Sequence, residues 1–474
     1  MTFISLEFWV FMSAVYVLYR LLPLHWQNRM LLVASYIFYG WWDWRFLSLI
    51  WISTIFDFLV GLALGGEKRP RARVCILLVS LFVNLGLLGF FKYFNFFAES
   101  MAVFLGSAGF TGNWTTLNII LPIGISFYTF QSMTYTIDIY RGKLQATRRF
   151  LDFALFVTFF PQLMAGPIER AANLLPRLMN TRTITMEQSS RGVYLILLGL
   201  FKKVAIADGL APFVNAVYNS SGAVSWVEIL LATYLFAFQI YCDFSGYSDI
   251  ARGLAKLLGI ELMTNFNLPY MARNPREFWS RWHISLSTWL RDYLYISLGG
   301  NRGGRGKTYR NLMLTMVLGG LWHGAAWNFV LWGFYHGVCL CLHRVFAREE
   351  TGPAPSSSLW QSVRNIASMV LFFHITCYGW LLFRANSFAE IARFTWTLFT
   401  GSGGLVVTPK LPSFCVLAGL PLLLLLDSMQ YFAGTPHFYQ KWQVPLRAAL
   451  YASLIFVLLT GLSNESTEFI YFQF

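Results

Sequence analysis

The sequence predicts an all-α polytopic membrane protein, with about 10–12 transmembrane helices and additional re-entrant or interfacial helices. Of the 474 residues, 56% are hydrophobic and only 12% are charged, which is about half the charged fraction of an ordinary soluble domain. Many apolar stretches contain about 20 residues, the length that crosses the hydrocarbon core as a helix. No series of short alternating strands indicates an outer-membrane barrel.

Apolar stretches follow one another from the N-terminus onward. The first, near 8–24, is expected to be a retained helix, because residues 1–5 carry no basic residue and no small-residue cleavage site follows. The other spans are expected near 28–42, 46–64, 74–98, 118–139, 192–214, 226–243, 312–346 (broken or paired), 364–384, 413–427 and 447–463.

The formal net charge is +14, and its basic residues cluster in short loops between apolar spans. This pattern indicates cytoplasmic loops of a membrane protein rather than nucleic-acid binding. With the clusters at 68–73 and 141–149 in the cytoplasm, the loop at 99–116 lies outside and the N-terminus is periplasmic. Membrane lipids are therefore expected partners, and nucleic acid is not.

Two polar segments suggest how the chain is organised. The segment 167–192, which contains Pro176, is expected to be a cytoplasmic amphipathic connection. Proline, glycine and serine at 348–358 indicate a loop. We therefore expect a core at 1–346, a loop at 347–363 and C-terminal transmembrane helices at 364–474 that pack on the core.

The six cysteines form no CxxC pair, so neither zinc nor a disulfide framework is predicted.

His323 lies in an otherwise apolar segment and is flanked by Gly319, Gly320 and Gly324. An imidazole loses its hydration at membrane depth, and its charged form loses most. The glycines let a substrate or another backbone approach the ring closely. Two interpretations stand: a catalytic base, or a histidine that only links two helices by a hydrogen bond.

The region 266–310 is too polar to span a membrane, yet it is rich in aromatic and basic residues. It fits an interfacial amphipathic segment, and it equally fits a cytoplasmic pocket for an anionic ligand. Within it, Gly303 to Thr308 resembles the end of a P-loop, but Asn301 stands where the first glycine belongs. We expect this glycine-rich loop, with Arg302, Arg305 and Lys307, to contact phosphates or lipid headgroups.

Further polar groups lie near apolar segments. His283 lies in this aromatic and basic region, so it is expected nearer the cytoplasmic face than His323. Asp243 and Asp249 end a long apolar span. For Asp249 we favour structural pairing with nearby arginines, whereas for Asp243 both a structural and a functional role stay open.

The sequence contains neither a GxSxG nucleophile motif nor an HExxH motif. The simplest chemistry is then direct transfer, in which a histidine takes a proton from a hydroxyl that attacks an activated acyl group. Acyl-CoA suits the basic region, because its phosphates pair with arginine and lysine.

Several segments together resemble the membrane-bound O-acyltransferase family, in its bacterial alginate O-acetylation (AlgI-like) and D-alanyl-transfer (DltB-like) branch. The run Trp282-His283-Ile284-Ser285-Leu286-Ser287-Thr288-Trp289-Leu290-Arg291-Asp292-Tyr293-Leu294-Tyr295 resembles the alginate branch most closely. The other resembling segments are 121–128, 160–167, 243–249, 278–304 and 318–328.

The resemblance implies a multi-pass protein of the bacterial inner membrane, with its helices around a central funnel or tunnel. It implies that His323 is the catalytic histidine and that His283 is the second motif histidine, which we expect to position the donor. The expected activity is acetyl transfer from acetyl-CoA, without a bound cofactor or metal, for O-acetylation of an exported polysaccharide such as alginate. The resemblance also implies a periplasmic SGNH-type acetyltransferase and polysaccharide export machinery as partners. Expected substrate contacts are Asp243, Trp282, Arg291, Asp292, Trp322, Asn328, Arg302, Arg305 and Lys307.

Two alternatives remain at this point. One is the transfer of D-alanyl or another acyl group to a cell-envelope polymer. The other belongs to a different class: a transporter or channel whose histidines line a polar path.

Overall fold

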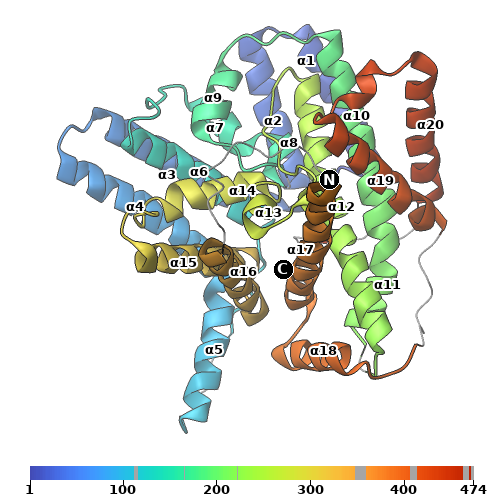
Figure 1. Cartoon of the computed structure of the whole chain (residues 1–474). Helices are drawn as coiled ribbons and strands as arrows, with labels where there is room; N and C mark the ends of the chain where they lie inside the picture. Colours follow the sequence, from blue (N-terminus) through green and yellow to red (C-terminus); the bar gives the residue numbers. More distant parts are fainter. Residues whose placement is uncertain are drawn as a thin grey trace. The chain divides into compact units, whose positions relative to one another are not determined.

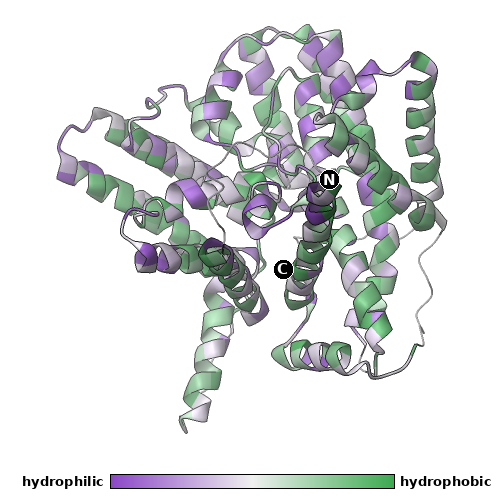
Figure 2. Ribbon diagram, viewed as in Figure 1, coloured by the Kyte–Doolittle hydropathy of each residue, from purple (hydrophilic) through white to green (hydrophobic). Residues whose placement is uncertain are grey.

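The computed structural model describes residues 1–110, 116–164, 166–220, 222–346, 359–405, 414–462 and 469–470. Within these ranges the chain is helical and contains no strand, so the predicted all-α class is confirmed. Six helical stretches are long and apolar enough to cross a membrane: Leu24–Gly66, Pro70–Ser107, Trp226–Leu257, Trp327–Phe346, Leu359–Arg384 and Val416–Ala433. Apolar residues cover most of α4 and α5 (Figure 2). The chain is a multi-pass membrane protein.

The chain forms two compact units, of which the first comprises Met1–Ile196 and Ser248–Met263. Its helices are α1 (Leu6–Leu21), α2 (Leu24–Asp43), α3 (Leu47–Gly66), α4 (Pro70–Leu88), α5 (Phe94–Ser107), α6 (Ile125–Tyr140), α7 (Phe150–Thr158), α8 (Phe160–Leu163), α9 (Ala171–Met179) and the beginning of α10 (Met186–Leu200) (Figure 1).

A buried carboxylate links three helices of the first unit. Asp57 of α3 accepts hydrogen bonds from Ser80 Oγ at 2.8 Å and Asn84 Nδ2 at 2.9 Å, both on α4. Ser132 of α6 donates a third. Because each lone pair of a buried carboxylate needs a donor, this cluster fixes α3, α4 and α6 against one another.

The second unit comprises Leu197–Tyr247 and Thr264–Phe474. Its helices are α11 (Asp208–Tyr218), most of α12 (Trp226–Leu257), α13 (Pro275–Trp279), α14 (Ile284–Trp289), α15 (Arg305–His323), α16 (Trp327–Phe346), α17 (Leu359–Arg384), α18 (Phe388–Thr400), α19 (Phe414–Ala433) and α20 (Val444–Thr460). The π-helical turns η3 (Phe201–Ala207) and η5 (Leu290–Tyr295) also belong to it.

Helices α15 and α16 pack extensively against each other in this unit. They correspond to the broken or paired span predicted at 312–346, and the break lies at 324–326. A Cβ atom on Gly320 would overlap the carbonyl oxygen of Phe329, and one on Gly324 would overlap the Phe329 ring. Gly320 therefore admits the backbone of α16, as small residues do between membrane helices, and Gly324 admits an aromatic ring.

Several predicted segments differ from the structure. The expected loop at 99–116 is wrong in its first part, because the apolar chain continues through a π-helical turn at 89–93 into α5. Residues 111–115 lie outside the described ranges. Helix α6 begins at Ile125 rather than at 118, after Pro122 and after Gly124, whose φ of 75° stops regular helix.

Helix α12 extends to Leu257, beyond the predicted end at 243, because Asp243, Ser245 and Ser248 are buried within the fold instead of ending the helix at a surface. The segment 167–192 contains α9, which buries Leu174, Leu175 and Leu178 on one side, and the start of α10, so an amphipathic connection is found there; its cytoplasmic placement stays a prediction. The predicted boundary loop at 347–363 lies mostly outside the described residues, and α17 begins at Leu359.

Candidate functional site

His323 is the last residue of α15 and is 3% exposed. Aromatic rings surround it: the Trp332 centroid lies 5.0 Å away at an interplanar angle of 87°, Trp322 lies 5.2 Å away and Phe383 lies 5.7 Å away. Trp332 is on α16 and Phe383 is on α17, so three helices build this apolar enclosure. A titratable ring held in such surroundings is a candidate for proton transfer.

His283 directly precedes α14 in a left-handed backbone conformation, with φ 40° and ψ 54°. A left-handed conformation is unfavourable for a residue with a Cβ atom, and such strained residues cluster at functional sites. The side chain is fully buried, and burial lowers the pKa of His283 to about 3. His283 is therefore neutral at physiological pH.

Asn265 fixes the tautomer of His283. Its Oδ1 accepts hydrogen bonds from the backbone N–H of Ser285 at 3.3 Å and from Ser285 Oγ at 2.9 Å. Because a backbone N–H can only donate, this amide oxygen is correctly placed as an acceptor. The contact of 3.0 Å between Asn265 Oδ1 and His283 Nδ1 then requires a proton on Nδ1. Nε2 of His283 consequently carries the lone pair and can accept a proton or a hydrogen bond.

The two histidines are neighbours. Their ring centroids lie 6.3 Å apart, and Trp322 contacts both rings, at 5.9 Å from His283 and 5.2 Å from His323. A hydrogen-bonded oxygen lies roughly 4 Å from an imidazole centroid, so one oxygen atom can contact both rings at once. The segment before α14 places His283 in the interior beside His323, and the expectation that His283 lies closer to the cytoplasmic surface stays a prediction.

Trp282 and Trp322 take different places beside this pair. Trp322 lies against both imidazoles, as described. Trp282 is 1% exposed and packs against Trp380 at 4.7 Å and Phe266 at 5.0 Å. Trp282 directly precedes His283 in the chain, fills the core behind it and so supports the strained backbone at His283.

Asp243 belongs to a buried ionic cluster. Lys203 Nζ lies 2.8 Å from Asp243 and 2.6 Å from Asp208, and all three side chains are at most 5% exposed. The other Asp243 oxygen accepts a hydrogen bond of 2.7 Å from the backbone N–H of Ile470. Asp243 thus holds the backbone of Ile470, and its expected contact with substrate stays a prediction. Asp249 pairs with Arg252 at 3.2 Å, as the structural interpretation predicted.

Arg291 and Asp292 form an ion pair with each other at 2.7 Å, and the Arg291 side chain is 60% exposed. Asn328 donates hydrogen bonds to the carbonyl oxygens of Phe383 at 3.1 Å and Ala385 at 3.0 Å. Asn328 therefore ties the start of α16 to the end of α17 and holds the Phe383 ring beside His323. Direct substrate contacts of these residues stay predictions.

Arg302, Arg305 and Lys307 are exposed at the other end of α15. The helix has 19 residues, so these side chains begin about 27 Å from His323 along its axis. They are too far away to touch the reacting atoms. Only an extended donor with remote phosphates can reach both places, and this donor contact stays a prediction.

Three parts of the site were missed by sequence reasoning. Asn265 lies in no recognisable motif, and Phe383 and Trp332 look like ordinary apolar residues. Lys203 could have been found, because a lysine within an apolar span is unusual. Among the described residues, no group of three or more His, Cys, Asp or Glu side chains is placed to hold a metal ion.

Comparison with known proteins agrees with this geometry. Residues 146–351, which include both histidines, match a family model described as MBOAT, membrane-bound O-acyltransferase family. The chain is 44% identical to a probable alginate O-acetylase of Azotobacter vinelandii, over 78% of this chain and 72% of that protein. It is 35% identical to a peptidoglycan O-acetyltransferase of Helicobacter pylori, over 75% of this chain and 71% of that protein. It is 29% identical to a teichoic acid D-alanyltransferase of Bacillus subtilis, over 57% of this chain and 70% of that protein.

Proposed function

This chain belongs to the membrane-bound O-acyltransferase family and is an acyltransferase, and we propose that it takes an acetyl group from acetyl-CoA on the cytoplasmic side for O-acetylation of an exported polysaccharide such as alginate. The observation that carries the proposal is the buried pair of His283 and His323, with ring centroids 6.3 Å apart in an aromatic enclosure. An acyltransferase needs a base beside a water-poor acyl site, and this pair meets that need. Membership of the family also decides against the transporter alternative.

In the proposed reaction, His323 takes the proton of an acceptor hydroxyl. The hydroxyl oxygen attacks the thioester carbonyl carbon, a new C–O bond forms and the C–S bond breaks. The proton passes from His323 to the departing thiolate, so the products are an acetyl ester and free CoA. His283 positions the donor, because its Nε2 can accept a hydrogen bond from an N–H group of the donor.

The acceptor and its surroundings are inferred from the relatives. The Azotobacter protein bears the name of an alginate O-acetylase, and the Helicobacter protein that of a peptidoglycan O-acetyltransferase. Their higher identity favours acetyl over the D-alanyl group of the Bacillus relative. We place the chain in the bacterial inner membrane with its N-terminus in the periplasm, alongside a periplasmic SGNH-type acetyltransferase and polysaccharide export machinery.

The test is release of CoA from acetyl-CoA by the purified full chain. His323→Ala should lower the rate about 10²–10⁴-fold, the usual cost of losing a general base. His25→Ala is the matched control, because His25 is exposed. Near-normal turnover by well-folded His323→Ala protein would contradict the assignment.

The two histidines can be separated by a double variant. His283→Ala should weaken donor use but leave measurable turnover. The double variant should then be slower than His283→Ala alone. Equal and complete loss in both single variants, with no further loss in the double, would instead indicate one coupled proton relay. The thermal stability of each variant must be measured beside its activity.

A further inference from the structure

Three aromatic side chains form a cluster beside the histidine enclosure: Trp279, the last residue of α13, and Trp332 and His336 of α16. The ring centroids of Trp279 and Trp332 lie 5.7 Å apart, those of Trp279 and His336 lie 5.2 Å apart, and those of Trp332 and His336 lie 4.9 Å apart. Each ring therefore contacts the other two. Trp332 and His336 are both 1% exposed, so this Trp–Trp–His cluster is part of the interior.

Each ring of the cluster has one buried nitrogen that makes no hydrogen bond with any described residue. These atoms are Nε1 of Trp279, Nε1 of Trp332 and Nε2 of His336. An indole Nε1 carries a proton and can only donate, whereas an imidazole nitrogen can accept. Because buried polar groups in folded proteins are nearly always hydrogen-bonded, three such nitrogens in mutually contacting rings indicate that a polar ligand or water lies among them.

A glycine of α17 leaves the His336 nitrogen uncovered. A Cβ atom on Gly379 would lie 2.9 Å from His336 Nε2, so a side chain at position 379 would block this atom. The imidazole plane is held by the Phe278 ring, which stacks on it at an interplanar angle of 4° with the centroids 5.9 Å apart. The nitrogen is therefore both fixed in direction and open on the side of Gly379.

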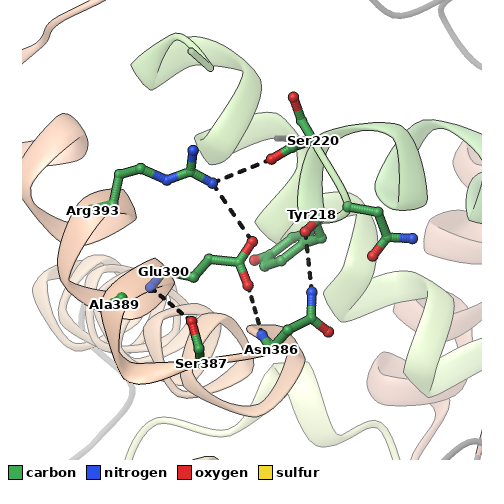
Figure 3. Close-up of a pocket in the computed structure, with 8 residues that line it drawn as sticks. Tyr218, Ser220, Asn386, Ser387, Ala389, Glu390 and Arg393 are labelled. Carbon is green, nitrogen blue, oxygen red and sulfur yellow. Dashed lines mark hydrogen bonds and ion pairs between the residues drawn. The ribbon is translucent and has the colours of Figure 1, made fainter. Parts of the chain in front are cut away.

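A polar pocket in the same unit shows the opposite arrangement. Where α11 ends and α18 begins, Arg393 pairs with Glu390 at 3.8 Å and donates to the carbonyl oxygen of Ser220 at 3.4 Å (Figure 3). Glu390 also accepts a hydrogen bond of 2.6 Å from the backbone N–H of Asn386. The charged groups of that pocket satisfy one another, so they indicate no ligand, in contrast to the nitrogens of the Trp–Trp–His cluster.

The cluster lies on the donor side of His323. Gly337, the residue after His336, packs against Met313, because a Cβ atom on this glycine would lie 2.7 Å from the Met313 sulfur. Met313 lies between the basic loop and His323 on α15. The Trp332 ring lies 5.0 Å from the His323 ring and 4.9 Å from the His336 ring, so it connects the two. A donor whose phosphates bind the basic loop must pass this level of the bundle to reach His323.

The three nitrogens suit a neutral amide rather than a phosphate. They provide two N–H donors and one imidazole acceptor, whereas phosphates are bound by arginine and lysine. A secondary amide offers the complementary groups, one carbonyl oxygen and one N–H. The pantetheine arm of acetyl-CoA contains two secondary amides, and the nitrogen of the farther one lies roughly 9 Å from the sulfur when the arm is extended. The two successive ring contacts from His323 through Trp332 to His336 match this reach.

We propose that the Trp–Trp–His cluster binds the pantetheine amide that lies farther from the sulfur of the donor. His336 Nε2 accepts a hydrogen bond from the amide N–H, and the indole N–H groups of Trp279 and Trp332 donate to the amide carbonyl oxygen. The amide nearer the sulfur remains for Nε2 of His283. The inference rests on the proposed function, and it adds the residues that recognise the neutral middle of the donor.

The experiment compares two donors without phosphates: S-acetylpantetheine, and its analogue in which an ester oxygen replaces the N–H of the farther amide. Thiol release by the purified full chain in detergent gives kcat/KM for each donor, and the ratio of the two values is the readout. Because both values come from one protein preparation, loss of folded material cancels in the ratio. The variants are His336→Phe, which keeps a ring without nitrogen, and Trp279→Phe, which removes one indole N–H. His343→Phe is the matched control, because His343 is on the same helix but outside the cluster.

The wild type should prefer the amide donor at least about 10-fold, because the ester leaves His336 Nε2 facing an oxygen without a proton. His336→Phe should bring the ratio close to one. Trp279→Phe should lower kcat/KM for both donors, which share the carbonyl group, and keep the ratio. His343→Phe should behave as the wild type.

A wild-type ratio of one would overturn the inference and make the cluster a site for buried water. A preference that survives in His336→Phe would overturn it as well. If His336→Phe releases no thiol, the same ratio is taken from the dissociation constants of the two donors. Failure of the wild type to release CoA from acetyl-CoA would contradict the proposed function and this inference with it.

Discussion

Gly320 of α15 and Gly333 of α16 meet where the two helices cross, and a Cβ atom on Gly320 would lie 3.1 Å from the Gly333 Cα atom. It would also overlap the Phe329 carbonyl oxygen. His323 lies less than one helical turn further along α15. The position of the His323 ring therefore depends on a close backbone contact that only glycine permits.

The first prediction concerns this contact. Gly320→Ala should separate α15 from α16, at a cost of about 1–3 kcal/mol in the free energy of unfolding, and should displace His323. We expect a lower melting temperature and a loss of turnover of at least about 10-fold. Gly306→Ala on the same helix is the control, because a Cβ atom there meets nothing within 4 Å. Equal behaviour of the two variants would refute the argument.

Asn265 should act as a positioning residue for His283. Asn265→Ala removes the acceptor that keeps the proton on Nδ1 of His283, so we expect kcat to fall by about 10–100-fold. Asn265→Asp keeps an acceptor oxygen and should restore part of kcat. Its negative charge should also raise the pKa of His283 and shift the pH profile of the variant to higher pH. If Asn265 were only structural, the pH profile would not shift. An active Asn265→Asp variant with the wild-type pH profile would therefore contradict the positioning role of Asn265.

Glu169 predicts a pH dependence of stability. Its side chain is 1% exposed and accepts a hydrogen bond from the Met263 backbone N–H. Burial raises the pKa of Glu169 to about 7, although this hydrogen bond and the positive charges of Arg177, Arg170 and Arg252 lower it in part. The ordinary pKa of a glutamate is about 4.5. At a pH between 4.5 and 7, Glu169 therefore keeps its proton in the folded state but has lost it in the unfolded state. Stability contributed by this group is therefore present at low pH and is lost as the pH rises towards 7.

The measurement is the melting temperature of the wild type and of Glu169→Gln between pH 5 and 8. The variant should melt higher than the wild type at pH 8, and the difference should shrink towards pH 5. His283 acts in the opposite direction, because its lowered pKa costs stability below pH 6.5. Since both proteins contain His283, the difference between their melting temperatures isolates Glu169. A difference that stays constant with pH would contradict the assignment.

The basic loop at the start of α15 should bind the remote phosphates of the donor. Replacing Arg302, Arg305 and Lys307 with glutamine should raise the apparent KM for acetyl-CoA and make the remaining activity less sensitive to salt, with kcat little changed. The control is the same replacement at Lys68, Arg69 and Arg71, which are also exposed. If the loop only anchors lipid headgroups, both triple variants will keep the wild-type KM in detergent.

The sequence predicts much of this fold because membrane helices leave a strong local signal. Apolar runs identify the spans, and the glycines beside His323 correctly indicate that another backbone approaches. The ends of helices are harder to predict. Glu99 is exposed and does not end α5, which continues to Ser107. Asp243 does not end α12, because its buried partner Lys203 is distant in the sequence.

The same limit applies to the site. His323 could be singled out from its own segment, whereas its proximity to His283 depends on how the chain folds back between α12 and α14. Asn265 carries no local signal at all, because an asparagine next to a phenylalanine is unremarkable until Ser285 and His283 are brought to it. A sequence therefore reveals which side chains are chemically unusual more readily than which of them meet.

The left-handed backbone at His283 has a consequence for the evolution of this sequence. A residue with a Cβ atom in that conformation costs the fold of order 1–3 kcal/mol, and glycine would relieve much of the cost. His283→Gly protein is thus expected to melt at least as high as His283→Ala protein, although it loses a methyl group from a packed interior. Selection for stability alone would remove the histidine from this position, so stability and the proposed role of His283 in activity compete at a single residue.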